Sequence, residues 1–186
     1  MSVARPILLL LAAALLGCAT GGVIGGAYYA PQYSWSEFYA VTDGRNFQVI
    51  VSGNPFPALT EADFRRRLLP VMQANKPRPN LTFTYQAPPE PPRPDYRMVL
   101  VFNAANDLTA DRVCAGQVWH KPEATRPFDL FAVYCRNDQV MSYTTAWTEA
   151  TGPNDPRVGQ LMAQLFLVLF PEYPLLRRGA RPFTRW

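Results

Sequence analysis

The chain has 186 residues, which suits one domain with a sizeable hydrophobic core. Its net charge is +4, from 16 Arg, 2 Lys and 14 acidic residues, and this mildly basic balance does not argue for a nucleic-acid partner. There is one histidine, His120, and the sequence holds no His-Glu-x-x-His, Cys-x-x-Cys, Gly-x-Ser-x-Gly or glycine-rich phosphate-loop motif. We therefore expect neither a metal nor a cofactor.

The N-terminal segment has the organisation of an export signal. Arg5 supplies positive charge, residues 7–16 are all Ile, Leu or Ala, and the run ends in Leu15-Leu16-Gly17-Cys18. This apolar run is too short to span a bilayer alone. The segment resembles the lipobox of bacterial lipoproteins. The resemblance implies a signal peptide at 1–17, cleavage before Cys18, and attachment of acyl chains such as palmitate to that cysteine.

Two other interpretations of this segment stay open. No charged residue lies between Arg5 and Glu37, so an uncleaved helix from about Ile7 to Tyr29 would also be apolar enough to span a membrane. Gly21, Gly22, Gly25 and Gly26 would then give that helix small-residue spacings suited to pairing. Alternatively, Cys18 follows an ordinary signal peptide by chance.

The favoured organisation is a lipidated Cys18 with a flexible tether at 18–32, followed by a periplasmic domain at 33–186. The tether is expected from its glycines and its lack of charge. Ala19 follows the lipidated cysteine in place of the Asp that signals inner-membrane retention in some bacteria. The outer membrane is therefore favoured over the inner membrane.

The first half of the domain is expected to contain a hairpin and a helix. Asp43-Gly44 is a strong turn signal, which predicts strands at 36–41 and 46–52. Thr60 and Asp63 resemble an N-terminal capping pair, and apolar residues recur at helical spacing after them. Pro70 should kink or split this helix. Three arginines lie off its apolar face, Arg65, Arg66 and Arg67. They are expected to form a solvated surface, and contact with anionic lipid or cell wall is the alternative.

Two further strands are predicted on either side of a proline-rich segment. Leu81 to Gln86 reads as a strand, and Tyr96 to Phe102 reads as a central strand because it is apolar on both faces. Pro88 to Pro94 is expected to be an extended connector. A ligand for an aromatic groove is the alternative for that segment.

Three strands are predicted at 113–120, 128–136 and 139–147, the last two joined at Asn137-Asp138. This register puts Phe128, Tyr134, Tyr143 and Trp147 on one aromatic-rich face. If Cys18 is lipidated, Cys114 and Cys135 remain as a pair, and an oxidising periplasm favours a disulfide between them over two reduced thiols.

The geometry of that disulfide would locate the histidine. Placing Cys114 directly opposite Cys135 sets His120 against Asp129, although a diagonal or inter-element link stays open.

The pair Asp155-Pro156 starts a final helix that Pro171 ends, with its second half buried almost all round. The arginine-rich tail at 177–186 is expected to be loosely docked or to lie on a membrane surface.

The predicted fold is a single α+β domain: an antiparallel β-sheet of about six strands with two helices packed on one face. Five side chains are candidates for a ligand pocket that would take a lipid, glycan or peptide, namely Trp119, His120, Tyr134, Tyr143 and Trp147. The alternative for these aromatic residues is a place in the core.

The predicted function is a non-enzymatic binding or assembly role for a membrane-anchored lipoprotein of the bacterial envelope. Its partners would be the membrane, through the lipid anchor, and an envelope protein, lipid or glycan. Two alternatives are an envelope hydrolase that uses His120 with nearby carboxylates and a single-span structural subunit paired through its glycines.

Overall fold

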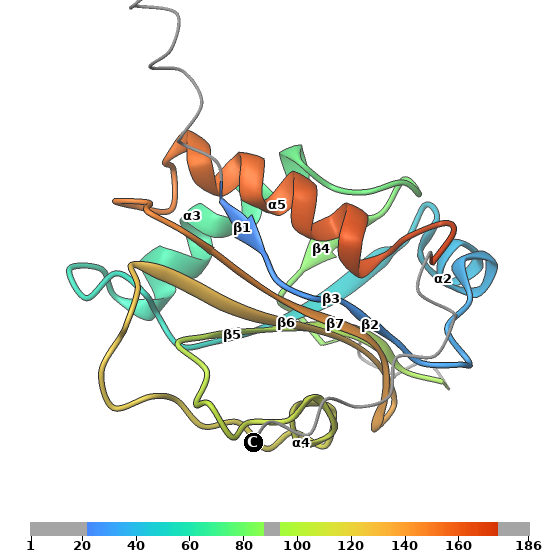
Figure 1. The fold of residues 1–186 in the computed structure, drawn as a ribbon. Helices are drawn as coiled ribbons and strands as arrows, with labels where there is room; N and C mark the ends of the chain where they lie inside the picture. Colours follow the sequence, from blue (N-terminus) through green and yellow to red (C-terminus); the bar gives the residue numbers. More distant parts are fainter. Residues whose placement is uncertain (1–21, 88–93, 175–186) are drawn as a thin grey trace, which may run out of the picture.

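A computed structural model describes residues 22–87 and 94–174. This part of the chain is α+β, with one seven-stranded sheet in the order β1-β7-β6-β5-β3-β4, and β2 also pairs with β7. Helices α3 and α5 lie on one face of the sheet and α4 on the other (Figure 1). The elements are β1 (Val23–Ile24), β2 (Tyr28–Tyr29), α2 (Trp35–Thr42), β3 (Asn46–Ser52), α3 (Glu61–Ala74), β4 (Thr82–Thr84), β5 (Tyr96–Phe102), α4 (Ala110–Cys114), β6 (Phe128–Arg136), β7 (Gln139–Thr148) and α5 (Pro156–Leu169).

The sheet is mixed, which corrects the expected antiparallel arrangement. Strand β3 pairs in parallel with both β4 and β5, whereas β5, β6 and β7 are antiparallel. Helix α3 returns the chain from the end of β3 to the start of its neighbour β4 in the manner of a βαβ unit, which makes this pair parallel, and β5 runs in the same direction on the other side of β3. The carboxyl ends of β3 and β5 therefore lie side by side.

Residues 36–41 form helix α2, so the predicted hairpin around Asp43-Gly44 is wrong. Ser34 is the N-cap of α2 and accepts a hydrogen bond from the Glu37 amide at 3.4 Å. This Ser-x-x-Glu spacing is a capping signal that the turn prediction overlooked. The chain does turn after α2, and Gly44 accommodates the turn with φ of +67°.

Helix α3 begins as predicted. The Thr60 side chain accepts a hydrogen bond from the Asp63 amide at 3.1 Å, and Phe64, Leu68 and Met72 are buried. Pro70 does not split the helix, which continues to Ala74. Pro70 is exposed, so water can solvate the carbonyl group that loses its helical partner.

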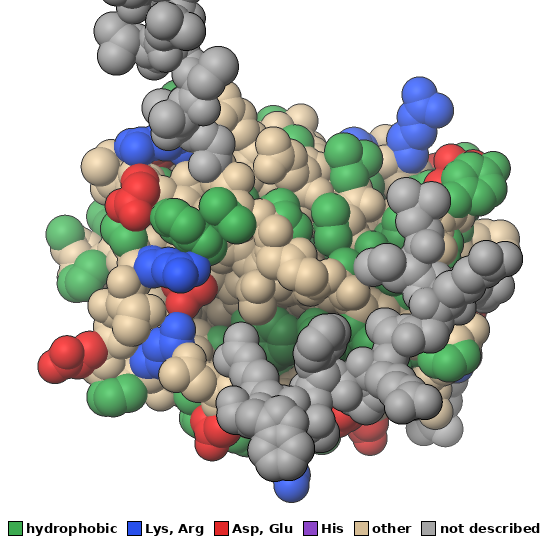
Figure 2. Space-filling model, viewed as in Figure 1, with side chains coloured by type: hydrophobic (Ala, Val, Ile, Leu, Met, Phe, Trp, Pro, Cys, Tyr) green, Lys and Arg blue, Asp and Glu red, His purple; other side chains and the backbone are tan. Residues whose placement is uncertain are grey.

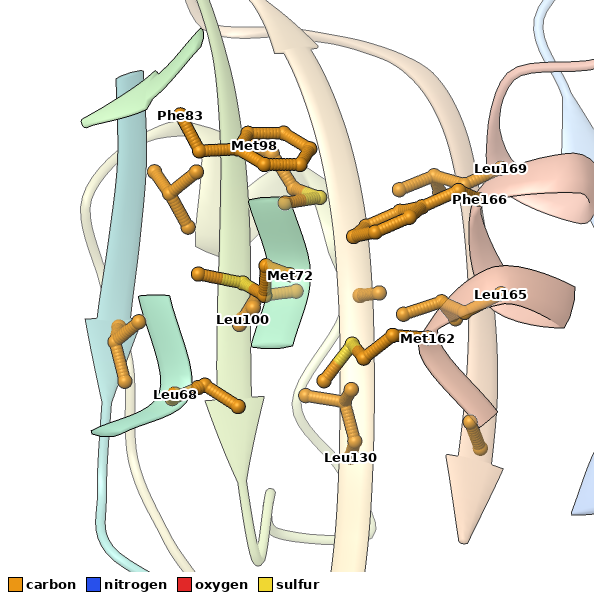
Figure 3. Close-up of a cluster of buried hydrophobic side chains, with 14 of the residues drawn as sticks. Leu68, Met72, Phe83, Met98, Leu100, Leu130, Met162, Leu165, Phe166 and Leu169 are labelled. Carbon is orange, nitrogen blue, oxygen red and sulfur yellow. The ribbon is translucent and has the colours of Figure 1, made fainter. Parts of the chain in front are cut away.

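The main core lies between the sheet and helices α3 and α5. Figure 3 shows side chains from both helices meeting side chains of β4, β5 and β6 in this layer. Helix α5 starts at the predicted cap, where Asp155 accepts from the Arg157 amide at 3.0 Å. Its second half is not buried all round, because Leu167 is 70% exposed. The fully buried residues shared by these elements are Leu68, Met72, Met98, Leu100, Leu130, Met162, Leu165, Phe166 and Leu169.

The predicted β6–β7 hairpin is present, with Arg136 opposite Gln139 across the turn. A bulge between Tyr134 and Cys135 shifts the register by one residue, so Tyr134 pairs with Ser142 instead of Met141. A one-residue shift reverses the faces of the strand. Tyr134 therefore packs in the core beneath α5, while Tyr143 lies on the opposite face. The predicted single aromatic face is wrong.

The predicted strand at 113–120 is also wrong, because residues 110–114 form helix α4. The expected disulfide is present: Cys114 and Cys135 are joined with a Cα–Cα distance of 5.6 Å. It links α4 to β6 and is thus the inter-element alternative rather than a cross-strand bond. Arg97 strengthens the same junction by donating to the Cys114 carbonyl at 2.6 Å.

Residues 22–32, expected to be a flexible tether, take part in the sheet. Val23 pairs with Trp147 and Tyr28 with Tyr143, so this segment lines the β7 edge. It is also not helical, against the alternative of a helix from Ile7 to Tyr29. Within the described ranges, no helix combines the length and the hydropathy needed to cross a bilayer. The lipobox, residues 88–93 of the predicted connector Pro88 to Pro94, and the tail at 177–186 lie outside the described residues.

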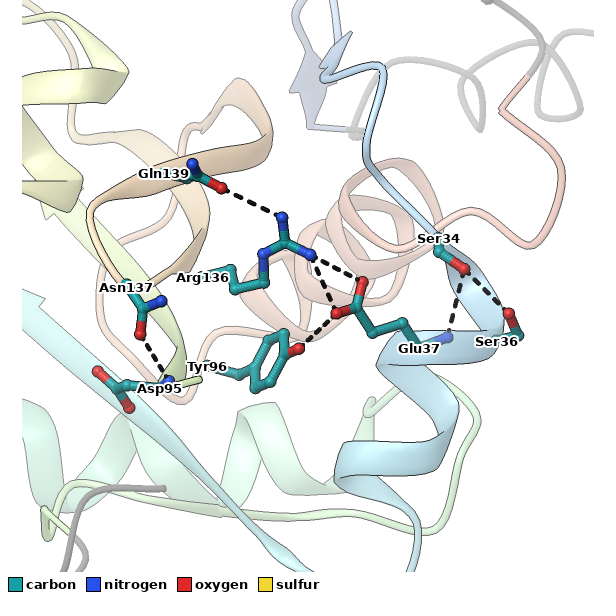
Figure 4. A network of polar contacts seen from close by, with 8 residues as sticks. All are labelled: Ser34, Ser36, Glu37, Asp95, Tyr96, Arg136, Asn137 and Gln139. Carbon is teal, nitrogen blue, oxygen red and sulfur yellow. Dashed lines mark hydrogen bonds and ion pairs between the residues drawn. The ribbon is translucent and has the colours of Figure 1, made fainter. Parts of the chain in front are cut away.

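Helix α2 is fixed to the sheet by a polar network (Figure 4). Arg136 of β6 donates to both carboxylate oxygens of Glu37, at 3.1 and 3.3 Å, and the Tyr96 hydroxyl donates to the same carboxylate. Burial and the hydrogen bond to Glu37 together raise the pKa of Tyr96 to about 12. This network holds α2 against the strand ends where β5 begins and β6 ends.

Candidate functional site

The second face of the sheet is only partly covered. Helix α4 and its flanking loops pack on β5 and β6, and beside them lies an open cleft of about 870 Å³. Figure 2 shows recessed apolar side chains on the α4 side of the molecule, and side chains of both charges gathered at the left of the view. The cleft is lined by β2, the loop before α4, α4 itself, and strands β6 and β7.

Aromatic side chains form much of the cleft floor. Tyr28 of β2 stacks on Tyr143 of β7 with ring centroids 5.0 Å apart, and Phe131 of β6 meets Tyr143 edge-on at 5.7 Å. Burial raises the pKa of Tyr143, and the neighbouring Tyr28 and Asp111 raise it further. These rings give the cleft a preformed apolar surface that can stack against a planar or cationic group.

The rim of the cleft is acidic. Among the residues that the structure describes, the acidic side chains of the lining are Asp111, Asp129 and Asp138, and its one cation is Lys121. Lys121 is already paired with Asp129, with an Nζ–Oδ2 distance of 2.8 Å. No ion pair of Asp111 or Asp138 occurs within residues 22–87 and 94–174. The carboxylates of Asp111 and Asp138 give the rim, as formed by the described residues, a negative potential that favours a positively charged ligand.

The five predicted pocket residues do not form one pocket. Tyr143 lines the cleft, but Tyr134 is buried on the opposite face of the sheet. The Trp119 ring nitrogen donates a hydrogen bond to Asp107 Oδ1 at 2.9 Å, which links the loop after α4 to the loop before it. Arg126 lies 4.6 Å from the centre of the Trp147 ring, outside the cleft lining. The sequence therefore identified one cleft residue and missed Tyr28 and Phe131.

The carboxylate expected to orient His120, that of Asp129, is not among its hydrogen-bond partners in the described residues. Asp129 pairs with Lys121, while the two ring nitrogens of His120 contact the Phe102 carbonyl at 2.8 Å and Ser52 Oγ at 3.1 Å. Ser52 ends β3 and Phe102 ends β5. The contact was not predicted, because the expected hairpin paired residues 46–52 with residues 36–41 instead of with β5.

The described ranges contain no group of three or more His, Cys, Asp or Glu side chains placed to hold a metal ion. Comparisons of the chain with protein-family models, curated proteins and solved structures find no match. The candidate site is therefore defined by its own geometry: an aromatic cleft with an acidic rim, next to a helix fixed by a disulfide.

Proposed function

We propose that the chain is a lipid-anchored protein of the bacterial envelope whose periplasmic domain has a binding or assembly role, carried by the cleft beside α4. The resemblance of Leu15-Leu16-Gly17-Cys18 to a lipobox supports the anchor. The disulfide supports an oxidising compartment, because cytosolic thiols are kept reduced. The outer membrane is the favoured location, since Ala19 follows Cys18.

The cleft is the observation on which the proposal rests, because it is open to solvent and its walls are a disulfide-linked helix and strands of the sheet. One wall includes α4, which the Cys114–Cys135 disulfide fixes to β6. The floor comes from the central and edge strands of the sheet. A site with such rigid walls loses little conformational freedom on binding, and this favours affinity.

The chemistry of the lining points to a ligand that combines positive charge with an aromatic or apolar group. Tyr28 and Tyr143 offer ring faces, and Asp111 and Asp138 offer carboxylates. A peptide segment that carries arginine next to an aromatic residue fits both features, because a guanidinium group pairs with carboxylates and stacks on rings. A peptide from an envelope protein is therefore the preferred partner over a neutral lipid or glycan.

Two tetrapeptides test this proposal directly: acetyl-Arg-Trp-Arg-Trp-amide and its charge-reversed counterpart acetyl-Glu-Trp-Glu-Trp-amide. The cationic peptide is expected to bind the full protein more tightly, as measured by calorimetry and by backbone amide shifts at Phe131 and Tyr143. Asp111→Asn and Asp138→Asn should each weaken that binding by about two- to fivefold, the range expected for partly exposed ion pairs.

Glu149→Gln is the matched control, because Glu149 is exposed and lies outside the cleft lining. It should leave the affinity for the cationic peptide unchanged. Equal binding of the two peptides, or equal effects of all three substitutions, would show that the acidic rim does not select the ligand.

A further inference from the structure

A serine and the only histidine of the chain are hydrogen-bonded where two parallel strands end. Ser52 is the last residue of β3, and its Oγ lies 3.1 Å from Nε2 of His120, which is 68 residues away in sequence. The Nδ1 atom of His120 lies 2.8 Å from the Phe102 carbonyl oxygen at the end of β5. Loops at the carboxyl ends of parallel strands are a common location for ligand sites.

The partners of the imidazole determine its tautomer. A carbonyl oxygen can only accept a hydrogen bond, so Nδ1 carries the proton and donates it to Phe102. In the neutral ring, Nε2 then has a free lone pair and accepts a hydrogen bond from the Ser52 hydroxyl. This is the arrangement of a nucleophile and a general base whose other nitrogen is oriented by a third group.

The local backbone is shaped around the ring. Gly53 has φ of +83°, and a Cβ there would lie 3.0 Å from His120 Cε1 and 2.9 Å from the Phe102 oxygen. His120 forms an isolated antiparallel β-bridge with Ala104. The amide of the next residue, Lys121, donates a hydrogen bond to the Asn103 carbonyl at 2.8 Å. These contacts fix the backbone of the histidine and of the residue after it.

Asn103, next to Phe102, carries two unfavourable features. Its φ is +52°, in the left-handed region, and its Oδ1 is buried without a hydrogen-bond partner among the described residues. Strained backbone and unsatisfied polar groups each cost free energy, and they concentrate at functional sites. This provides an observation independent of the Ser52–His120 contact.

We propose that Ser52 is a nucleophile and His120 its general base, in a site that hydrolyses esters of short apolar acyl groups. This site is distinct from the cleft, and its existence does not depend on the proposed binding role. His120 and the Ser52–His120 contact are solvent-accessible. Ile50, two residues before Ser52 on the same strand face, is 39% exposed and offers an apolar surface for the acyl group.

The reaction would proceed in two balanced steps. Ser52 Oγ attacks the carbonyl carbon and its proton passes to His120 Nε2, which then protonates the departing alcohol as the ester bond breaks. A water molecule next attacks the acyl carbon and gives a proton to Nε2, and the bond from the acyl carbon to Ser52 breaks. The products are a carboxylic acid and an alcohol, and Ser52 regains its proton from Nε2.

Labelling of the full wild-type protein with diisopropyl fluorophosphate tests the proposal, because an activated serine displaces fluoride from this reagent. Peptide mass spectrometry should find the diisopropylphosphoryl group on Ser52 and not on Ser36, an exposed serine of α2 whose Oγ contacts Ser34 Oγ at 2.9 Å. His120→Asn should slow labelling of Ser52 by about 100-fold, the scale of general base catalysis.

Turnover of p-nitrophenyl butyrate provides a second measurement. Ser52→Ala should abolish hydrolysis, whereas the matched variant Ser36→Ala should keep the wild-type rate. Absence of label on wild-type Ser52, or a wild-type rate in Ser52→Ala, would overturn the proposal. Neither result depends on whether the cleft binds peptides.

Discussion

Replacing Cys114 and Cys135 together with alanine should lower the free energy of unfolding by about 3 kcal/mol, as the chain-entropy model gives for a loop of this length. The two cysteines are 21 residues apart and both are fully buried. Loss of the link also removes the covalent tie between α4 and β6, so the cleft wall should become more mobile. Urea unfolding of the oxidised wild-type protein and of the double variant measures the difference.

Reductant supplies an internal control for this prediction. Reduced wild-type protein should approach the stability of the double variant, and the double variant itself should not respond to reductant. The affinity for acetyl-Arg-Trp-Arg-Trp-amide should fall in parallel with the loss of the link. Unchanged unfolding after removal of both cysteines would contradict a structural role for the disulfide.

Gly25→Ala should destabilise the domain by about 1–3 kcal/mol, because an added methyl group would overlap the Thr145 hydroxyl of β7. A Cβ at Gly25 would lie 2.1 Å from Thr145 Oγ1, and the Gly25 amide donates to the Thr145 carbonyl at 2.7 Å. The strand edge must therefore separate or Thr145 must move. Thermal and urea unfolding would detect either response.

Gly26→Ala is the matched control, since no atom of the described residues beyond its two chain neighbours lies within 4 Å of a Cβ built at that position. It should change stability by no more than about 0.5 kcal/mol. Equal effects of the two substitutions would contradict the close pairing of residues 22–29 with β7. A change of oligomeric state in both variants would instead support the alternative of glycine-mediated helix pairing.

The elements that the sequence predicted correctly carry local signals. Asp155-Pro156 marks the start of α5, and Thr60 marks that of α3, because capping and helical periodicity depend on neighbouring residues. Strands β5, β6 and β7 were recognisable by their apolar runs and by the Asn137-Asp138 turn. The disulfide followed from the parity of the cysteines, a property of composition rather than of fold.

The errors arose where distant parts of the chain decide the structure. A single bulge after Tyr134 put the side chains of β6 and β7 in a different register from the predicted one, and no residue type in the hairpin predicts a bulge there. The pairing of β1 and β2 with β7 connects segments more than 100 residues apart, so a glycine-rich stretch looked like a tether. Helix α2 is different, because the Ser34–Glu37 spacing was readable and was outweighed by the turn signal at Asp43-Gly44.

The candidate site was the least predictable part. Its aromatic floor joins Tyr28, Phe131 and Tyr143 from three strands, and only the register brings them together. Ser52 and His120 meet because β3 and β5 are parallel neighbours, an arrangement excluded by the predicted hairpin. Composition indicated the aromatic residues and the histidine as candidate site residues, but the residues that each of them contacts depend on tertiary structure.

The intact mass of the protein extracted from membranes, with and without reductant, tests the lipid anchor and the disulfide together. We expect a mass equal to residues 18–186 plus acyl chains, which rises on reduction by the hydrogens added to the Cys114–Cys135 disulfide. The unlipidated mass of residues 1–186, or a mass insensitive to reductant, would contradict a lipid-anchored domain in an oxidising compartment.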